Sequence, residues 1–167
     1  MSSLGRTASD RGICVRLATA VDIASIVSVT NAAFAVETFL EGTRTDETRL
    51  AEMMRKGCFL VADAGRSHIV ASVYIELRGV RGYFGMLAVD PSHQGKGLGR
   101  LMVEAAENHC RARGCSAMDI AVLSLRPELP PYYRKLAYVE TGTEEFHPSR
   151  PLKGGVECHC IVMSKAL

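Results

Sequence analysis

The spacing of hydrophobic residues predicts a strand followed by a helix near the beginning of the chain. A short, partly apolar stretch spans 14–18, and Ile23, Ile26 and Val27 then recur at the spacing of one helix face. A second helix is predicted over 45–57, where acidic residues come first and a lysine and a glycine come last. The chain therefore opens with a βα unit and a second, shorter helix.

Largely apolar segments then follow in quick succession over 58–64, 69–77 and 82–90. Short turns that contain glycine separate them, as is typical of neighbouring antiparallel strands. The last of these segments ends before Pro91, because proline cannot continue the hydrogen-bond ladder of a strand. The pattern predicts an antiparallel meander.

An amphipathic helix is predicted from Leu98 to Arg113. Leu98, Leu101 and Met102 share its apolar face, and Glu107 is among the charged residues expected on the opposite face. Such a helix is expected to pack its apolar face on the sheet.

The rest of the chain alternates strand and helix again. A strand is predicted over 116–125, a short helix over 130–136, and two closing strands over 138–146 and 156–166. The long hairpin loop between the closing strands, 147–155, is the segment expected to be most flexible. No internal repeat or low-complexity tract interrupts this order, so a single mixed α/β domain is predicted.

Length and composition fit one domain. The chain has 167 residues, of which 47% are hydrophobic, enough for an ordinary packed core. We expect a flexible N-terminus over 1–12 and one domain over 13–167. A net charge of +2 favours neither a nucleic-acid nor a membrane partner. No segment approaches the roughly 20 apolar residues of a membrane span, and the polar beginning lacks the apolar core of a secretory signal, so a cytoplasmic location is expected.

The six cysteines are expected to be reduced thiols that mostly fill core positions. They include no CxxC pair, and the CHC sequence at 158–160 would place its cysteines and its histidine on opposite faces of a strand. No second pair of ligands with zinc-site spacing is present, so no metal is expected.

Glycines mark the beginning of the amphipathic helix, in the sequence QGKGLG. Glycine in a helix costs up to about 1 kcal/mol relative to alanine, so Gly95, Gly97 and Gly99 indicate a function that side chains would obstruct. The first helical N–H groups have no partner within the helix and suit an anion, and Lys96 and Arg100 add positive charge. The segment fits neither a Walker loop nor a dinucleotide GxGxxG. The pattern favours a phosphate site.

Read as Q-x-x-G-x-G, this segment resembles the acyl-CoA pyrophosphate loop of the GNAT superfamily of N-acyltransferases. MLAVDPSHQGKGLGRLMVEAAENHCRARG resembles the central strand, loop and helix of that family, and PYYRKLAYVETG resembles its later LYxxxGF segment. The similarity extends over nearly the whole chain, from Val15 to Lys165. It implies a single GNAT-like α/β domain, whose mixed, mostly antiparallel sheet of about seven strands is flanked by helices and splayed between strands 4 and 5.

The same resemblance implies acetyl-CoA as cosubstrate and direct transfer of the acetyl group to a primary amine. The backbone of the fourth strand would pair with pantetheine, and the amides of the glycine-rich loop would hold the pyrophosphate. A non-catalytic acyl-CoA-binding regulatory module is the alternative. The cofactor-binding residues that the resemblance implies are Leu87, Ala88, Val89, Gln94, Gly95, Lys96, Gly97, Leu98, Gly99, Arg100 and Arg126.

Catalytic roles follow from the same similarity. Tyr133 matches the family tyrosine and would protonate the leaving thiolate, or it would only pack against CoA and orient it. The fifth-strand glutamate of some relatives is replaced by Ala121, so Glu76 or Asp119 is the candidate general base, unless each is a solvated strand carboxylate. A chain of water molecules or an amine that arrives neutral would also suffice. Ala137 stands where the family has a glycine.

The acceptor is expected to enter opposite CoA, near 34–43. There Glu37, Phe39 and Glu41 would suit a cationic or partly apolar amine, either a small molecule or a peptide, unless the segment is only a solvated loop. Arg126 could pair with a substrate carboxylate or a coenzyme phosphate, or lie on the surface. The closing strands could also form a homodimer.

Overall fold

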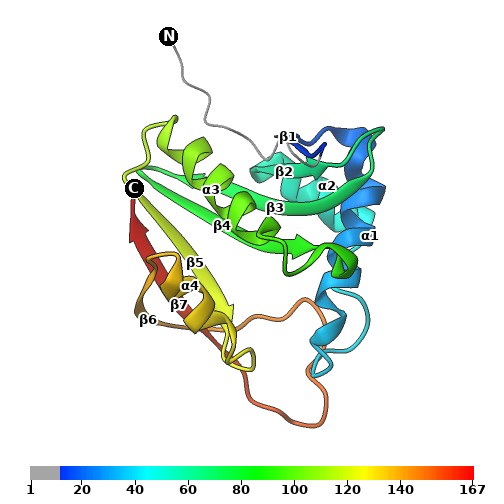
Figure 1. Cartoon of the computed structure of the whole chain (residues 1–167). Coiled ribbons are helices and arrows are strands. Elements are labelled where there is room, and N and C mark those ends of the chain that lie inside the picture. The colour runs from blue at the N-terminus through cyan, green and yellow to red at the C-terminus, as the bar shows by residue number, and fades with distance from the viewer. Residues whose placement is uncertain (1–11) are drawn as a thin grey trace.

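The computed structural model describes residues 12–167, and the predicted flexible N-terminus, 1–12, falls outside the described residues except for its last position. The described chain forms a seven-stranded sheet in the order β1-β2-β3-β4-β5-β7-β6 (Figure 1). Strands β4 and β5 are parallel, and the other neighbouring pairs are antiparallel. The mixed, mostly antiparallel sheet predicted from the sequence is confirmed. The strands are β1 (Cys14–Leu17), β2 (Cys58–Asp63), β3 (Ile69–Arg78), β4 (Arg81–Val89), β5 (Ala117–Leu123), β6 (Val139–Glu145) and β7 (His159–Ala166).

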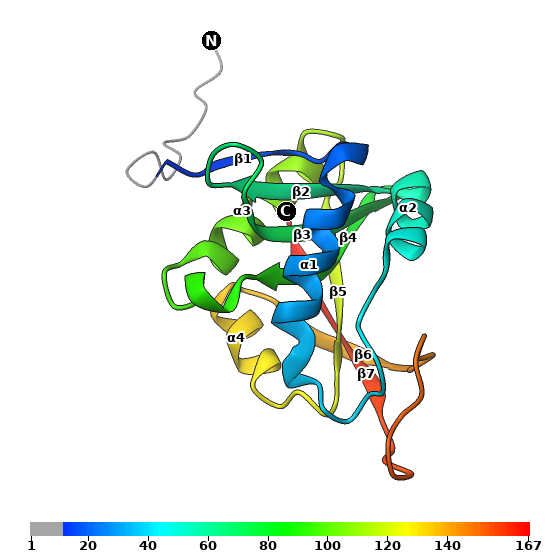
Figure 2. The same ribbon diagram turned by 90° about the vertical axis from the view of Figure 1, so that its right-hand side faces the viewer.

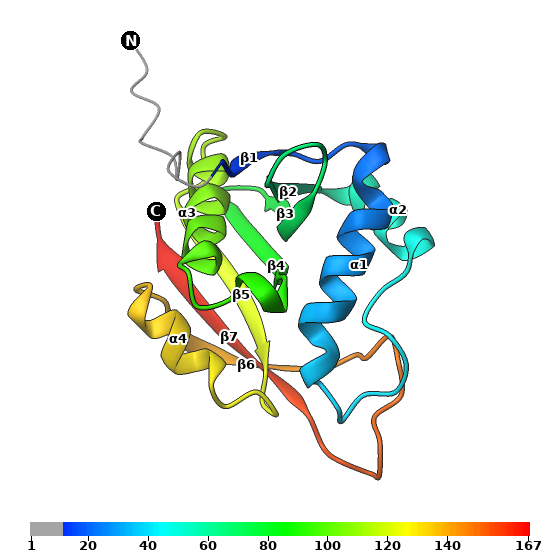
Figure 3. The same cartoon turned by 45° about the vertical axis from the view of Figure 1, so that its right-hand side comes forward.

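Helices cover both faces of this sheet. Helix α1 crosses in front of β3 and β4 in Figure 2 and packs beside α2, whereas α3 lies on the opposite face (Figures 2 and 3). Each helix lies where the sequence predicts it, and the ends predicted for α2, α3 and α4 differ from the observed ends by at most two residues. The helices are α1 (Ile23–Ala33), α2 (Glu47–Lys56), α3 (Leu98–Arg111) and α4 (Leu129–Lys135).

The core is divided by the sheet into two apolar clusters. On one face, Ile26 of α1 and Leu50 of α2 pack against Phe59 of β2. On the other face, Met102 of α3 packs in a larger cluster that includes Phe84 of β4 and residues of α4. Both clusters bury residues that the period-two and period-3.6 patterns place on apolar faces.

The ladder between β4 and β5 is short. It pairs Arg81–Tyr83 with Ala117–Asp119, at the beginning of both strands. Beyond these pairs the two strands diverge, as Figure 1 shows. The later part of β4 therefore has a strand partner on its β3 side alone.

Glu107 differs from the prediction that it lies on the polar face of α3. It is only 5% exposed, and its carboxylate accepts hydrogen bonds from the Tyr138 hydroxyl at 3.0 Å and from the Lys165 ammonium at 2.9 Å. A buried carboxylate is tolerated when a charged partner and a hydrogen bond compensate it. Both partners come from distant parts of the sequence, so helical spacing could not reveal them.

Ala137 adopts a left-handed backbone conformation, with φ of 72°, two residues after the end of α4. This is the position where the sequence resemblance has a glycine, which adopts positive φ without strain. The turn is still formed, because the Ala137 and Tyr138 amides donate to the carbonyls of Arg134 and Tyr133.

The loop predicted to be most flexible, 147–155, is attached to the segment between α1 and α2. The amides of Lys153 and Glu41 donate across the two segments to the carbonyls of Phe39 and Pro151, each at 2.9 Å. Two segments far apart in sequence thus lie side by side at the open end of the sheet (Figure 1).

Candidate functional site

Two cavities meet where β4 and β5 diverge. The glycine-loop cavity, of about 470 Å³, lies between α4 and the loop that leads into α3. The arginine cavity, of about 310 Å³, lies among β4, β5, the segment between α1 and α2, and the loop before β7. Both cavities touch the same group of residues, which we call the shared wall. The shared wall consists of Phe34, Leu87, Arg126, Leu129 and Tyr133.

Most of the residues predicted to bind a cofactor line the glycine-loop cavity. Ala88 and Lys96 line neither cavity, and Ala88 is buried in the core. The residues that line the glycine-loop cavity are Leu87, Val89, Gln94, Gly95, Gly97, Leu98, Gly99, Arg100 and Arg126.

The glycines of this loop meet two different structural requirements. Gly95 and Gly97 have φ of 76° and 78°, which L side chains rarely adopt, and a Cβ atom at either position would meet open space. Gly99 instead allows close packing, because a Cβ atom there would lie 2.8 Å from the Tyr132 hydroxyl. The loop is therefore shaped by its backbone and leaves room for a ligand beside it.

Helix α3 begins at this loop, with Gly97 as its N-cap. The first intrahelical hydrogen bond runs from the Leu101 amide to the Gly97 carbonyl, so the amides of Leu98, Gly99 and Arg100 have no acceptor within the helix. These donors and the positive end of the helix dipole can hold an anion. The residues present thus fit a phosphate group.

A β-bulge interrupts β4 beside the cavities. Ser72 pairs with Ala88 and Tyr74 pairs with Gly85, so β4 carries one more residue than β3 between these pairs. Met86, within the bulge, has a φ of 51°. A bulge leaves backbone groups out of the regular ladder and re-aims them, and Leu87 of the shared wall is one of its residues.

Gly85 precedes this bulge and lies under an aromatic ring. A Cβ atom at Gly85 would lie 2.7 Å from the hydroxyl of Tyr83. At the end of the same strand, the Gln94 side-chain amide donates to the Val89 carbonyl at 3.1 Å and ties the loop to β4.

Tyr133 is the most enclosed polar side chain of the shared wall. Its side chain packs against Phe84 and Tyr138, and the residue is 6% exposed. Burial raises the pKa of its hydroxyl above the ordinary tyrosine value. Within residues 12–167 the hydroxyl makes no hydrogen bond, so its proton can be donated to a bound molecule.

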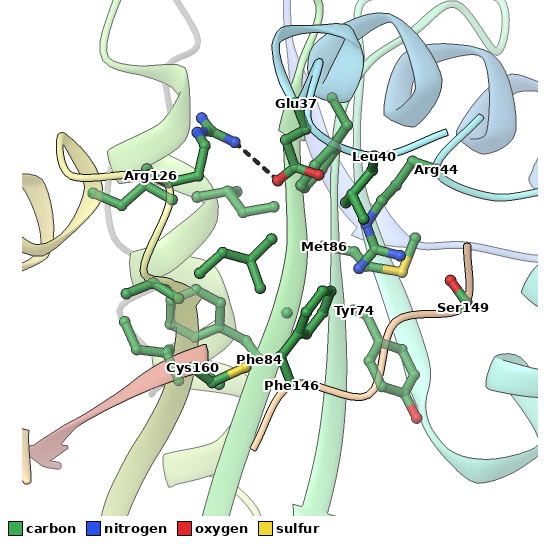
Figure 4. A pocket seen from close by; sticks show the side chains of 18 of the residues that line it. Glu37, Leu40, Arg44, Tyr74, Phe84, Met86, Arg126, Phe146, Ser149 and Cys160 are labelled. Carbon is green, nitrogen blue, oxygen red and sulfur yellow. Dashed lines mark hydrogen bonds and ion pairs between the residues drawn. The ribbon is translucent and has the colours of Figure 1, made fainter. Parts of the chain in front are cut away.

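The arginine cavity has an uneven distribution of charge. Glu37, of which 4% is exposed, is the one carboxylate among the described residues that line it. One Glu37 oxygen accepts from Arg126 at 3.1 Å (Figure 4), and the other accepts from Arg150 at 3.0 Å. Arg44 and Arg49 line the same cavity. The Arg126 guanidinium also donates to Glu128 at 2.5 Å, so it lies on the shared wall already engaged by two carboxylates.

This arrangement corrects the expectation for the segment 34–43. Glu37 lines the cavity, but two arginines neutralise it, and neither Phe39 nor Glu41 lines the cavity. The segment therefore does not form an acidic site for a cationic amine. Sequence reasoning missed Arg44, Arg49 and Arg150, because no motif marks them and folding alone brings them together.

The two predicted base candidates lie in ion pairs outside both cavities. Partial burial raises the pKa of Glu76. Hydrogen bonds from Arg78 and from the Tyr74 hydroxyl outweigh this effect and hold the pKa of Glu76 below its ordinary value. A bidentate hydrogen bond from Arg81 lowers the pKa of Asp119. A carboxylate with a lowered pKa is a weaker base, so the geometry gives neither residue support in that role, which stays a prediction.

No group of three or more His, Cys, Asp or Glu side chains within residues 12–167 could hold a metal ion. All six cysteines of the chain lie in this part and are free thiols. Over the same residues, no helix is long and apolar enough to cross a membrane.

Comparisons with known proteins agree with the loop and the sheet. The model of the acetyltransferase (GNAT) family matches residues 26–138. Among curated proteins, glucosamine 6-phosphate N-acetyltransferase 1 of Oryza sativa subsp. japonica is 29% identical over 112 residues, which make up 62% of this chain and 66% of that protein.

Solved structures of similar fold extend over nearly the whole chain. The ribosomal-protein-S18-alanine N-acetyltransferase of Escherichia coli has a TM-score of 0.70 and 17% identity, and the match covers 92% of this chain and 93% of that chain. A GNAT-superfamily phosphinothricin acetyltransferase from Sinorhizobium meliloti, solved in complex with acetyl-CoA, has a TM-score of 0.71 and 19% identity, with 93% and 89% covered. At such low identity these likenesses show a common fold.

Proposed function

The chain belongs to the acetyltransferase (GNAT) family, and from that premise we propose that it transfers the acetyl group of acetyl-CoA directly to the nitrogen of a primary amine. The glycine-loop cavity would hold acetyl-CoA, and the arginine cavity would hold the amine. The shared wall is the observation that carries this proposal, because donor and acceptor bound in the two cavities would meet there.

Acetyl-CoA supplies an activated acetyl thioester when it is bound. Pantetheine would lie along the backbone of 87–89, and the later part of β4 supports this placement because it has no β5 partner. The pyrophosphate would lie against the amides of 95–100, beside the charges of Lys96 and Arg100. The positive φ values of Gly95 and Gly97 and the open space beside them support this part.

Two residues of the shared wall would have different chemical roles in the transfer. The amide of Leu87, within the bulge, would donate to the carbonyl oxygen of the acetyl group, where negative charge develops. Tyr133 would give its proton to the leaving thiolate. Its burial, its raised pKa and its lack of another hydrogen-bond partner within 12–167 support this role, because a general acid must still carry its proton when the leaving group departs.

We propose that no carboxylate side chain removes the proton of the attacking amine. Glu37 lies in the arginine cavity but both of its oxygens are engaged by arginines, and Glu76 and Asp119 lie outside both cavities. An amine that binds in its neutral form attacks without a base. Its nitrogen then loses a proton to water, and Tyr133 regains a proton from water after it has protonated the thiolate. The rate at low amine concentration should then rise with pH until it passes the pKa of the free amine.

The names of the relatives do not select an acceptor. They specify an amino sugar phosphate for the rice protein, ribosomal-protein alanine for the bacterial one, and phosphinothricin for the third. Small-molecule and peptide amines therefore both belong in a first test, since one fold serves many substrates.

Mass spectrometry of acetylated products across a mixed panel of amines tests the proposed function. The panel contains amino acids, amino sugars, polyamines, aminoglycosides and short peptides, with acetyl-CoA as the donor. Product mass is preferable to thiol reagents, because the chain has six cysteines of its own. We expect one class of amine to be acetylated. Tight CoA binding with no product from any amine would overturn enzymatic transfer and favour an acyl-CoA-binding regulatory module.

A further inference from the structure

The arginine cavity has more positive charge than its own carboxylate can balance. Four arginines, Arg44, Arg49, Arg126 and Arg150, line it together with Glu37. Glu37 already accepts hydrogen bonds on both oxygens, from Arg126 and from Arg150. The guanidinium groups of the other two, Arg44 and Arg49, donate no hydrogen bond to any carboxylate of residues 12–167.

Arg44 is the clearest case of an uncompensated charge. It forms no ion pair with any carboxylate of residues 12–167, and its guanidinium lies over the ring of Phe34, 5.3 Å from the centroid. Burial lowers the pKa of the Arg44 guanidinium. The charge of Glu37 raises this pKa, and the positive charges of Arg49 and Arg150 lower it further. Burying a cation without a counter-ion is costly, so the arrangement favours a bound anion.

The positions of these arginines define an orientation. Arg44 and Arg49 line the arginine cavity alone, whereas Arg126 also lines the glycine-loop cavity. Figure 4 shows Arg44 and Arg126 on opposite sides of Glu37. The uncompensated charge of Arg44 thus lies beside Phe34 of the shared wall and on the side of Glu37 opposite Arg126.

We propose that the acceptor is an amine that also carries an anionic oxygen group, a carboxylate or a phosphate, which binds Arg44 and Arg49. The inference rests on the proposed function, because it takes the arginine cavity as the acceptor site. The guanidinium group presents N–H donors in a planar fork that matches both anions. With its anion held by Arg44 and Arg49, which line the arginine cavity alone, the molecule would direct its nitrogen toward Leu87 and Tyr133 of the shared wall.

Matched acceptor pairs test this proposal on the full-length protein. Each pair differs only in the anionic group: amino acids against their amides, and amino-sugar or aminoalkyl phosphates against the dephosphorylated amines. We expect kcat/KM to be about 10- to 100-fold higher for the anionic member of at least one type of pair. The type that shows the difference identifies the anion as carboxylate or phosphate. Preference for the neutral members or for polyamines would overturn the proposal.

Substitutions of single arginines test where the anionic group of the acceptor binds. Arg44→Gln and Arg49→Gln should raise KM for the anionic amine about tenfold or more and leave its neutral counterpart nearly unchanged. Arg44→Lys should restore part of the affinity, because it keeps the charge but not the fork. Arg55→Gln is the control: Arg55 is exposed on the same helix as Arg49 and lines neither cavity. Equal losses for both members of a pair, or an equal effect of Arg55→Gln, would contradict the assignment.

A binding measurement separates this inference from the proposed function. Titration calorimetry with the anionic amines and with inorganic phosphate, on the wild type and on Arg44→Gln, requires no turnover. Arg44-dependent binding without acetylation of any amine would overturn the transfer reaction and keep the anion site. Acetylation of neutral amines, with anion binding that Arg44→Gln leaves unchanged, would overturn the anion site and keep the reaction.

Discussion

The glycine-loop cavity and the arginine cavity meet at one wall but are built in different ways. The first depends on backbone: two positive-φ glycines, the amides at the beginning of α3 and the edge of β4. These features come mostly from one continuous stretch, 87–100. The second depends on side chains from separate segments, including Arg44 before α2 and Arg150 in the loop before β7.

This difference corresponds to the tasks proposed for the two cavities. Backbone amides recognise a phosphate whatever the rest of a ligand is, and a fixed cofactor needs no more. Side chains on connecting segments can change without altering the sheet, so they suit a substrate that differs between related proteins. The comparison teaches that the site for a common ligand is local in sequence and the site for a particular ligand is not.

The largest effect is expected from a substitution that blocks the glycine-loop cavity. Gly97→Glu places a carboxylate beside the proposed pyrophosphate site, and like charges about 4 Å apart cost about 4 kcal/mol at the effective dielectric of a protein surface. We expect CoA affinity, measured by titration calorimetry, to fall on the order of 1,000-fold. Gly114→Glu is the matched control, because Gly114 also has a positive φ and open space but lies at the other end of α3. Equal CoA affinity in the two variants would disprove the loop assignment.

The same contrast explains which features of the molecule can be predicted from the sequence. The order of helices and strands follows from hydrophobic spacing, and the loop follows from Gly95, Gly97 and Gly99, because each of these signals lies within a few residues. Glu107 was misplaced on a solvated face, since its partner Lys165 is 58 residues away. Contacts of that kind are decided by tertiary packing, which a local pattern does not contain.

The arginine cavity also depends on contacts between residues far apart in sequence, and here they change the predicted character of the site. Glu37 suggested a site for a cationic amine, and the sequence gives no sign that Arg126 and Arg150 neutralise it from 89 and 113 residues away. Uncompensated charge is visible only when every neighbour of a group is known. The chemical character of the proposed acceptor site can therefore be seen in the structure but not in the sequence.

A smaller effect is expected at the shared wall, where the two cavities depend on one side chain. Tyr133→Phe removes the proposed acid without changing the ring, so kcat should fall by about 100-fold while CoA affinity changes little. Because the pKa of Tyr133 is raised, the wild-type rate should show no loss of this acid below the ordinary tyrosine pKa of about 10. Product formation followed by mass spectrometry over pH 6 to about pH 10 checks both expectations.

Tyr138→Phe provides the control for this substitution. Tyr138 is a buried tyrosine of the same core cluster and lines neither cavity; its hydroxyl donates to Glu107. Its removal should lower thermal stability and leave kcat of the folded protein nearly unchanged. A wild-type kcat in Tyr133→Phe would restrict Tyr133 to packing.

The smallest effect on activity is expected outside both cavities, at Asp119. If no carboxylate acts as the base, Asp119→Asn should leave kcat/KM within about twofold of the wild type. It should lower Tm at pH 7 by about 2 °C, because it removes an ion pair that is largely at the surface. The hydrogen bond from Arg81 keeps the pKa of Asp119 lower in the folded than in the unfolded chain, where it is about 3.9. The stabilisation is therefore present above about pH 4 and is lost as pH falls through the folded pKa, so the Tm difference should vanish in acid. A large loss of kcat with unchanged CoA affinity would instead make Asp119 the base, and the chemistry would then extend beyond the shared wall.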